Sequence, residues 1–354
     1  MLLFVASISA QDADLFKRKT VEDRMLKVAQ WQLANPKHEA YDWTNGAFYA
    51  GIFAAYETTK SPELMKALMD MGEKNQWKPG PRFDHADDIA ISQTYIDIYR
   101  LTKDHRMIQP TIDSITRIGK ENSTQVEKNG IIWWWCDALF MGPPTLAKLA
   151  KTTRDKSYLD LNDKFFQQTY DRLYDKGERL YARDASYLIN ANGEGKREAN
   201  GQKVFWSRGN GWVAGGLVRL LKELPKNHPK REFYLAQYKA ILDRVAGLQQ
   251  ADGLWRSSLL DPVSYAGGES SGTGFYIYAM AWGINNRILD RDKYLPVVKK
   301  AWTGLNTLVH PDGMVGWTQP IGADPRRNFG ADSWEVYGAG AYMLAASEIV
   351  KLKS

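Results

Sequence analysis

The chain has 354 residues, of which 44% are hydrophobic and 25% are charged, a composition typical of a globular protein. Its formal net charge is +6, but the lysines and arginines are scattered rather than gathered in a basic run, which argues against nucleic-acid binding and is compatible with an anionic small substrate. The single cysteine, Cys136, excludes an intramolecular disulfide, and no apolar run reaches the roughly 20 residues that a membrane-spanning helix needs.

The first residues differ from the rest of the chain. Residues 2–11 read LLFVASISAQ, an apolar stretch that ends in small residues. This pattern resembles the hydrophobic region and cleavage site of a secretory signal that lacks its basic start. We therefore expect residues 1–11 to be a signal-peptide remnant and residues 12–354 to form a single domain. We also expect export, to the periplasm in a bacterium, with the cytoplasm as the alternative.

Beyond this start, apolar residues spaced three and four apart dominate, and alternating strand patterns are rare. The first amphipathic helix is predicted from Thr20 to Ala34, with Thr20 and Asp23 as a capping pair. Its inward-facing stripe is Val21, Met25, Val28 and Ala29. Further amphipathic helices are predicted to begin near Ser61, His105, Ser157, Arg231 and Asp292.

Each amphipathic helix is followed by an apolar helix that is rich in small residues and begins beside aromatic and polar side chains. These segments are residues 42–59, 87–102, 137–151, 208–222, 270–289 and 333–350. Inner helices that are apolar nearly all round, alternating with amphipathic outer ones, are what a closed helical ring requires. The predicted fold is therefore all-α, an (α/α)6 barrel of six inner and six outer helices.

The connections between these helices are unequal in length. Those from an inner helix to the next outer helix are short, as between Thr59 and Ser61. The long connections, which lead from outer to inner helices, are residues 75–86, 120–136, 175–207, 250–269 and 309–332. Because long structured loops are usually functional, the end of the barrel where the inner helices start is predicted to be the working end. Helix N-termini there favour an anionic ligand.

Asp137 is the first candidate for chemistry, because it follows the run Trp133–Cys136 at the start of an inner helix. Apolar burial raises the pKa of such a carboxyl and the helix N-terminus lowers it, a balance that suits a group that gives and then takes a proton. The alternative is a simple N-cap under a tryptophan-lined wall. Cys136 is expected to be a packed thiol, since no histidine lies near it in the sequence.

A second acidic group, Asp84-His85-Ala86-Asp87-Asp88, precedes the next inner segment. One of its carboxylates is expected to be an N-cap, and another to face Asp137 across the mouth. Two carboxylates on one site are the minimum for sugar chemistry. A metal site is not expected, because the cluster lacks a second histidine.

The motif Trp206–Trp212, WSRGNGW, begins the fourth inner helix. Arg208 offers a planar fork for a carboxylate, and Trp206 and Trp212 offer faces for sugar rings. The alternative for Arg208 is a structural pair with a neighbouring acid. Other predicted substrate-binding residues at the same rim, which capping would explain equally well, are Asp42, Trp43, Ser271 and Trp334.

Together these motifs resemble glycoside hydrolase family 105, the unsaturated rhamnogalacturonyl hydrolases, and the related family 88. The resemblance runs from Thr20 to the C-terminus. It is carried by WWWCDALFM (133–141), WSRGNGW (206–212), DGLW (252–255), ESSGTG (269–274) and WEVYGAGAY (334–342). It implies an (α/α)6 barrel acting on oligosaccharides left by polysaccharide lyases, which carry a C4=C5 double bond in their terminal, non-reducing uronic acid. No metal or cofactor is implied.

The resemblance also implies roles for individual residues. Asp137 would be the general acid and base, assisted by Asp88 or Asp87, whose register stays open. Trp135, with the residues of the WSRGNGW motif, would surround the uronate. One departure concerns Arg183, which stands where many members have a histidine, and this leaves the identity of the leaving sugar open.

The implied reaction is the hydration of a vinyl ether. Asp137 protonates C4, water adds at C5, and the resulting hemiketal opens and releases the next sugar. The alternatives are a conventional glycosidase, a sugar 2-epimerase or a non-catalytic glycan-binding barrel. An epimerase would need histidines at the mouth, where only His85 and His310 are expected. The choice between gluco and galacto uronate and the oligomeric state stay open.

Overall fold

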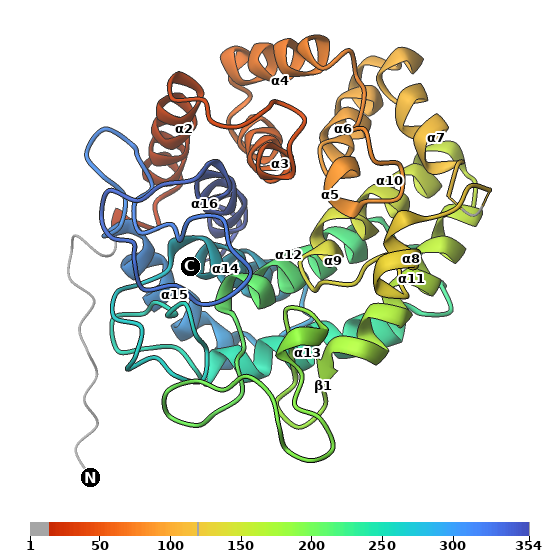
Figure 1. Ribbon diagram of the computed structural model, residues 1–354. Helices are drawn as coiled ribbons and strands as arrows, with labels where there is room; N and C mark the ends of the chain where they lie inside the picture. Colours follow the sequence, from red (N-terminus) through yellow and green to blue (C-terminus); the bar gives the residue numbers. More distant parts are fainter. Residues whose placement is uncertain (1–13, 119, 354) are drawn as a thin grey trace.

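The structure, a computed structural model, describes residues 14–118 and 120–353, so the predicted signal remnant lies outside the described residues. Within this part of the chain, two concentric layers of helices form one ring (Figure 1). The inner layer consists of α3 (Trp43–Thr59), α5 (Ala86–Ile89) with α6 (Ser92–Thr102), α9 (Ala138–Met141) with α10 (Pro143–Thr153), α12 (Ser207–Glu223), α14 (Ser270–Asn285) and α16 (Val336–Ile349). The outer layer consists of α2 (Arg18–Ala34), α4 (Pro62–Lys74), α7 (Gln109–Ile115), α11 (Ser157–Leu173), α13 (Arg231–Ala246) and α15 (Arg291–Asn306).

The remaining elements are short and lie in the connections. They are η1 (His105–Met107), α8 (Thr124–Asn129), η2 (Ala185–Tyr187) and the antiparallel pair β1 (Tyr174–Asp175) and β2 (Leu180–Tyr181). The all-α barrel predicted from the sequence is therefore confirmed. None of the helices in residues 14–118 and 120–353 combines the length and the apolar character needed to cross a membrane.

The predicted helix starts agree with the structure at most positions, but the capping pair Thr20–Asp23 is wrong. Helix α2 begins two residues earlier, at Arg18, and its N-cap residue Lys17 makes no side-chain capping bond. Thr20 instead donates a hydrogen bond to Asp14, and Asp23 pairs with Lys19 along the helix. The inward stripe is as predicted, since Val21, Met25, Val28 and Ala29 are all fully buried.

Two of the inner segments are broken, which the sequence analysis did not predict. The second stops at Ile89 and resumes at Ser92, and the third stops at Met141 and resumes at Pro143. Pro143 and Pro144 explain the later break, because proline lacks the N–H that a continuous helix needs and is well placed in a first turn. Each break leaves a one-turn helix, α5 or α9, at the end of the barrel where the acidic candidates lie.

Small residues let the inner helices approach closely enough to close the ring. Where α3 meets α16, a Cβ atom added at Gly51 would lie 2.7 Å from the carbonyl oxygen of Gly340, and one added at Gly340 would lie 2.5 Å from that of Ala47. Glycine is therefore needed at both positions for the backbones to touch. This contact joins the first inner helix to the last and so fixes the diameter of the barrel mouth.

Candidate active site

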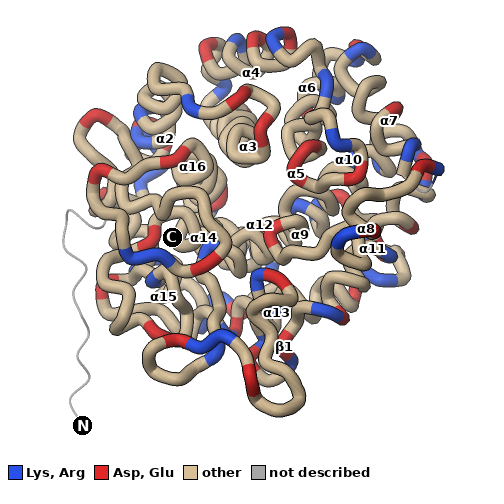
Figure 2. The backbone as a smooth tube through the Cα atoms, viewed as in Figure 1, with Lys and Arg blue, Asp and Glu red and all other residues tan. Residues whose placement is uncertain are grey.

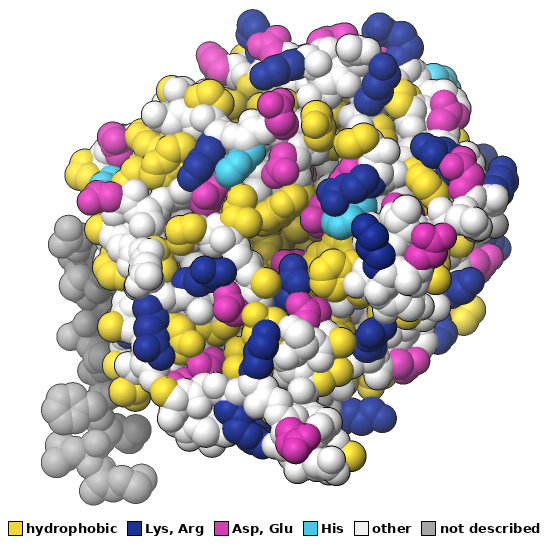
Figure 3. All heavy atoms as spheres, viewed as in Figure 1, with side chains coloured by type: hydrophobic (Ala, Val, Ile, Leu, Met, Phe, Trp, Pro, Cys, Tyr) yellow, Lys and Arg dark blue, Asp and Glu magenta, His cyan; other side chains and the backbone are white. Residues whose placement is uncertain are grey.

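The end of the barrel where the inner helices begin is open and carries both acidic and basic residues (Figure 2). The surface view shows a hollow near the centre of this face, with hydrophobic side chains inside it and charged side chains around it (Figure 3). A cavity of about 190 Å³ lies between α3 and α5 at this end. Its lining residues are Tyr41, Asp42, Trp43, Pro81, Arg82, Asp87 and Asp88.

Asp137 precedes α9 as its N-cap residue, but its side chain does not cap the helix. The residue is 8% exposed, and its Oδ1 lies 3.8 Å from Nε of Arg183. Burial raises the pKa of the Asp137 carboxyl above its ordinary value, and the Arg183 and Arg208 guanidinium groups oppose that rise. The environment of Asp137 therefore favours the protonated carboxyl more than water does, which is the direction of shift that a proton donor requires.

Asp87 lies in the first turn of α5, and its side chain is 19% exposed. Burial raises the pKa of Asp87 well above its ordinary value, the negative charge of Asp137 raises it further, and Arg82 opposes both. The charge of Asp137 therefore reaches Asp87 at the mouth and favours the protonated form of the Asp87 carboxyl.

Asp88, the other candidate for the assisting carboxylate, is hydrogen-bonded to Arg82 through both of its carboxylate oxygens. Its Oδ1 accepts a hydrogen bond from Nε of Arg82 at 3.0 Å, and its Oδ2 accepts one from the Arg82 backbone N–H at 2.7 Å. Its backbone carbonyl also accepts from Gly80. Asp88 thus holds the loop of residues 80–82 against α5. The sequence left open which of the two aspartates assists Asp137, and these contacts of Asp88 favour Asp87.

The third aspartate of this group, Asp84, has a structural role. It is 3% exposed and accepts hydrogen bonds from the Ser123 hydroxyl and the Gln125 backbone N–H at the start of α8. Burial raises the pKa of Asp84, but these hydrogen bonds outweigh burial and leave it below the ordinary value. His85 stacks on Trp135 with ring centroids 4.6 Å apart, and burial lowers its pKa to about 4, so it is neutral at neutral pH.

The predicted aromatic residues form the walls and floor of the mouth rather than exposed platforms. Trp135, Trp206 and Trp212 are at most 3% exposed. Trp212 packs between Phe140 and Phe275, with ring centroids 4.8 and 4.3 Å away. Trp43, which is partly exposed, covers Trp212 edge-on and lines the cavity. Stacking of a sugar on any of these rings stays a prediction.

Arg208 is fully buried, with its guanidinium over the Trp206 ring. Its two terminal nitrogens donate hydrogen bonds to the backbone carbonyls of Gln319 and Pro320, at 2.5 and 3.1 Å. The predicted alternative of a structural pair with a neighbouring acid is therefore not what holds it. Among the described residues its Nε has no hydrogen-bond partner, so the role of Arg208 as a carboxylate ligand stays a prediction that uses this remaining donor.

Arg183 lies between the catalytic candidate Asp137 and its own neighbour Asp184. It donates to Asp184 at 2.7 Å and places its guanidinium 5.3 Å from the centre of the Trp134 ring. Its Nε is buried and, within the described part of the chain, lacks a hydrogen-bond partner. The same is true of the indole nitrogen of Trp212. Unpaired donors at one mouth are the arrangement that an anionic ligand satisfies.

Three other predicted rim residues have contacts that account for them. Asp42 is the N-cap of α3 and accepts from the Thr44 N–H at 2.9 Å. Ser271 is fully buried and donates its hydroxyl to Glu269, the N-cap of α14, so for this residue the capping alternative describes the structure. Trp334 packs edge-on against Trp31 of the outer helix α2, so it lies toward the outer layer of the ring.

The sequence analysis missed Arg82 and Tyr41, which line the mouth cavity, and the segment of Gln319 and Pro320 that anchors Arg208. Arg82, Gln319 and Pro320 lie in long loops with no periodic pattern, so only the shared position of those loops pointed to them, and Tyr41 lies in the shorter connection between α2 and α3. The predicted packing of Cys136 is confirmed, because the thiol is fully buried and burial raises its pKa well above the ordinary value. In residues 14–118 and 120–353, no cluster of three or more histidine, cysteine or acidic side chains is arranged to hold a metal ion.

Comparison with known proteins adds to this geometry. A family model described as Glycosyl Hydrolase Family 88 matches residues 17–353. The chain is 44% identical over 361 residues to an unsaturated 3S-rhamnoglycuronyl hydrolase of Formosa agariphila, an alignment that covers 98% of this chain and 96% of that protein.

Two solved structures share the whole ring. A glycosyl hydrolase family 88 protein from Bacteroides vulgatus matches with a TM-score of 0.86 at 29% identity, covering 95% of this chain and 100% of that one. A protein named as a polysaccharide lyase matches with a TM-score of 0.86 at 33% identity, covering 94% of this chain and 97% of that one.

The raised pKa of Asp87 predicts how stability changes with pH. Because the folded-state pKa lies above the unfolded value, the contribution of Asp87 is fully present below about pH 4 and is lost as the pH rises through the folded-state pKa. Asp87→Asn should therefore gain thermal stability relative to the parent protein as the pH rises. Melting temperatures measured from pH 4 to pH 9 test this.

Asp84→Asn is the matched control, because the folded-state pKa of Asp84 is lowered and the sign reverses. Its carboxylate stabilises the fold above the unfolded pKa, and that stability disappears as the pH falls through the folded value. The Asp84 variant should lose stability at neutral pH and approach the parent protein in acid. Two variants with parallel pH curves would contradict the assignment of opposite environments.

Proposed function

We propose which residues of this chain, which belongs to glycosyl hydrolase family 88, carry out the reaction of the family, and which oligosaccharide is the substrate. The enzyme is a glycosidase that removes a terminal 4,5-unsaturated uronic acid from lyase-generated oligosaccharides by hydrating the C4=C5 bond. The relationship predicted from the sequence motifs is thereby confirmed, and the finer proposals concern the acting residues, the leaving sugar and the compartment.

Asp137 is the proton donor and acceptor in this proposal. Its carboxyl group transfers a proton to C4 of the unsaturated ring, which leaves positive charge shared between C5 and the ring oxygen. The resulting carboxylate takes a proton from a water molecule as that water adds to C5. The hemiketal opens to a C5 ketone, the anomeric carbon becomes an aldehyde, and the next sugar leaves as an alcohol.

Asp87 keeps its proton through this cycle and orients the site as a neutral hydrogen-bond donor. The observation that carries the proposal is the coupling of two carboxyl groups of raised pKa at one mouth. The raised pKa of Asp137 favours the protonated form that a donor to carbon needs, and the raised pKa of Asp87 keeps that residue neutral beside it. The uronate carboxylate is proposed to accept a hydrogen bond from the Nε–H of Arg208. In this orientation the Asp137 carboxyl group would lie over the face of the sugar ring.

The leaving sugar is proposed to be a rhamnose that carries a sulfate group at O3. The 44% identical relative is named for a 3S-rhamnoglycuronyl substrate, and Arg183 supports the transfer of that specificity to this chain. The Arg183 side chain is partly exposed at the mouth, and among the described residues its Nε has no hydrogen-bond partner. Planar guanidinium groups suit the oxygens of sulfate and carboxylate, whereas the histidine that Arg183 replaces offers fewer donors.

The first test is the ultraviolet absorbance of the unsaturated uronide, which hydration destroys. Asp137→Asn should lower kcat by about 10²–10⁴-fold, because it removes the proton donor and leaves the shape of the site intact. The matched substitution Asp160→Asn, on the exposed face of α11, should leave the rate unchanged. A rise in absorbance on intact polysaccharide would indicate a lyase and contradict the proposal, as would an active Asp137 variant.

The second test compares fragments with and without the sulfate group on the rhamnose. The sulfated fragment should have at least about a tenfold higher kcat/KM, equivalent to roughly 1.4 kcal/mol. Arg183→Gln should abolish this preference by raising KM for the sulfated fragment, and Arg326→Gln, at an exposed loop site, should preserve it. Equal kcat/KM values for both fragments in the parent enzyme would exclude sulfate as the determinant.

Export is the remaining proposal and concerns the apolar segment 2–11. The substrate fragments arise outside the cytoplasm wherever a lyase is secreted, and a hydrophobic leader would place the hydrolase with them. Expression of the full chain in a bacterium, followed by cell fractionation, should recover the activity in the periplasm. Deletion of residues 2–11 should return it to the cytoplasm, and cytoplasmic activity of the full chain would contradict the proposal.

A further inference from the structure

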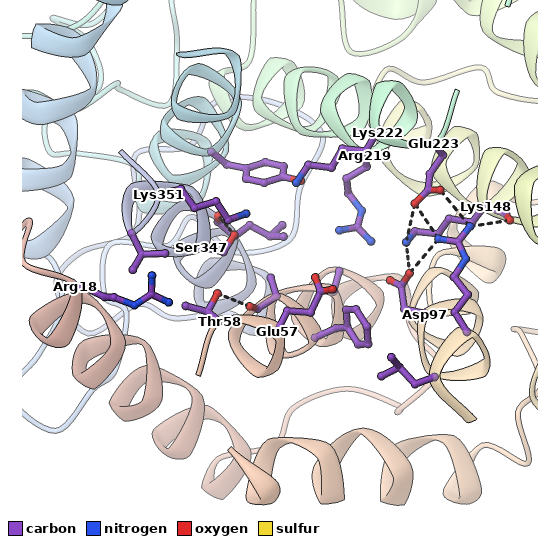
Figure 4. A pocket seen from close by; sticks show the side chains of 18 residues that line it. Arg18, Glu57, Thr58, Asp97, Lys148, Arg219, Lys222, Glu223, Ser347 and Lys351 are labelled. Atoms are coloured by element: carbon purple, nitrogen blue, oxygen red, sulfur yellow. Dashed lines mark hydrogen bonds and ion pairs between the residues drawn. The ribbon is translucent and has the colours of Figure 1, made fainter. Parts of the chain in front are cut away.

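A second cavity lies at the end of the barrel opposite to Asp137, where the inner helices finish, and this end is called the closed end. It has a volume of about 540 Å³ and is enclosed by the C-terminal halves of the inner helices α3, α6, α10, α12 and α14, and by α16 (Figure 4). Six basic and three acidic residues line it. A cavity of this size and polarity is not required by the reaction proposed for the mouth, so its residues need an explanation of their own.

Most of the charges around this cavity neutralise one another. Lys148 pairs with Asp97, and Arg100 donates to Glu223 at 2.9 and 3.1 Å. Several of the basic residues also occupy the last turns of inner helices, where a positive charge is favoured by the helix dipole. These ion pairs give the charged residues at the edge of the cavity a structural role. They do not include Arg219, which lies at its centre.

Arg219 comes from α12, is 8% exposed, and has no carboxylate within ion-pair distance among the described residues. Its Nε donates to the Gln93 side chain at 2.6 Å, and Gln93 in turn donates to the backbone carbonyl of Phe140 at 2.8 Å. One terminal nitrogen of Arg219 is buried and lacks a hydrogen-bond partner in the described part of the chain. Figure 4 shows the guanidinium directed into the open space of the cavity.

Two further donors border the same space. The ammonium group of Lys222 donates to Glu348 at 2.9 Å and to the Tyr278 hydroxyl at 3.2 Å, which leaves its third N–H without a partner in the part of the chain that the structure describes. Tyr278 is 1% exposed and accepts from Lys222, so its own O–H is available to donate. Arg219, Lys222 and Tyr278 therefore present donors to the cavity, and of its acidic lining residues Asp97 and Glu223 are paired with basic residues while Glu57 is exposed.

The charge balance agrees with this donor set. The lining carries three more basic than acidic residues, and the ion-pair partners outside it, which are Glu22, Glu348 and Lys151, leave an excess of two positive charges. A buried guanidinium without a counter-charge is costly, because burial removes the water that stabilises its charge. A doubly charged oxyanion would supply both the missing charge and the missing acceptors.

We propose that this closed-end cavity is a second binding site, specific for a small doubly charged oxyanion such as sulfate, phosphate or a short dicarboxylate. Arg219 is its principal ligand, and Lys222 and Tyr278 complete it. Gln93 holds the Arg219 guanidinium in place before the anion arrives, so binding requires little rearrangement. The site does not depend on the proposed function, since it shares no residue with the mouth.

Isothermal titration calorimetry of the full chain, without any oligosaccharide, tests the proposal. Sulfate, phosphate and malonate are titrated separately at constant ionic strength, with chloride as the balancing anion. One saturable site is expected, with a dissociation constant at or below about 1 mM for at least one of the three. The anion that binds most tightly identifies the chemical class of the ligand.

Variants then locate the site. Arg219→Gln should weaken binding at least tenfold, Arg219→Lys should retain part of it, and Tyr278→Phe should weaken it severalfold. Lys151→Gln is the matched control, because Lys151 pairs with Glu223 at the same end of the barrel but does not line the cavity. This control should bind as the parent protein does, although it loses the same charge as Arg219→Gln.

Three results would overturn the proposal. The first is the absence of saturable binding for all three anions in the parent protein, which would indicate a water-filled cavity. The second is unchanged binding in Arg219→Gln or, if that variant does not fold, in Tyr278→Phe. The third is binding that Arg183→Gln abolishes and Arg219→Gln preserves, which would place the anion at the mouth and leave the proposed function untouched.

Discussion

The burial of two neighbouring carboxyl groups is the constraint on which the rest of the mouth depends. Two ionised carboxylates cannot share a site that water has largely left, so the pair must retain a proton or recruit positive charge. Asp87 and Asp137 do both, since the pKa of each is raised and guanidinium groups stand beside each. The cost of burying these carboxylates lowers the stability of the fold, and the same burial favours the protonated carboxyl group that can donate a proton to carbon.

The two ends of the barrel treat acidic residues in opposite ways. At the closed end, burial raises the pKa of Glu223, but Lys148 and Arg100 outweigh burial and leave the pKa at about 2. Such a carboxylate stays ionised at any physiological pH and can only serve as a structural counter-charge. At the mouth, the neighbouring charges do not cancel the effect of burial on Asp87 and Asp137, whereas hydrogen bonds keep the pKa of Asp84 below its ordinary value. The direction of these shifts assigns proton chemistry to Asp87 and Asp137 and a structural role to Asp84 and Glu223.

The sequence predicted the alternation of inner and outer helices and the end of the ring that carries Asp137, because both follow from hydrophobic spacing and loop length. It could not predict the break between Ile89 and Ser92, since no proline or glycine marks that position. It also left Asp87 and Asp88 unresolved, because their difference is made by Arg82, a loop residue with no pattern of its own. Tertiary contacts of this kind decide which of two adjacent carboxylates binds a loop and which can take part in proton transfer.

The aromatic residues illustrate the same limit. Their number and position predicted a tryptophan-lined mouth, and Trp43 lines the mouth cavity. Exposure depends on which rings cover one another, and Trp212 is covered by Phe140, Phe275 and Trp43. The closed-end cavity had no sequence signal at all, because Arg219, Lys222 and Tyr278 occupy ordinary positions on helices that were predicted only as core elements.

The most direct test of the central claim is to run the reaction in heavy water that also contains oxygen-18 and to examine the uronate product by NMR and mass spectrometry. Proton transfer to carbon predicts one deuterium at C4, and addition of water predicts oxygen-18 at C5 in products analysed before the ketone exchanges. Conventional cleavage at the anomeric carbon would place oxygen-18 at C1 and leave the original ring oxygen on C5, even if the released enol ether later opens to the ketone and takes up deuterium at C4. That second pattern would contradict the account.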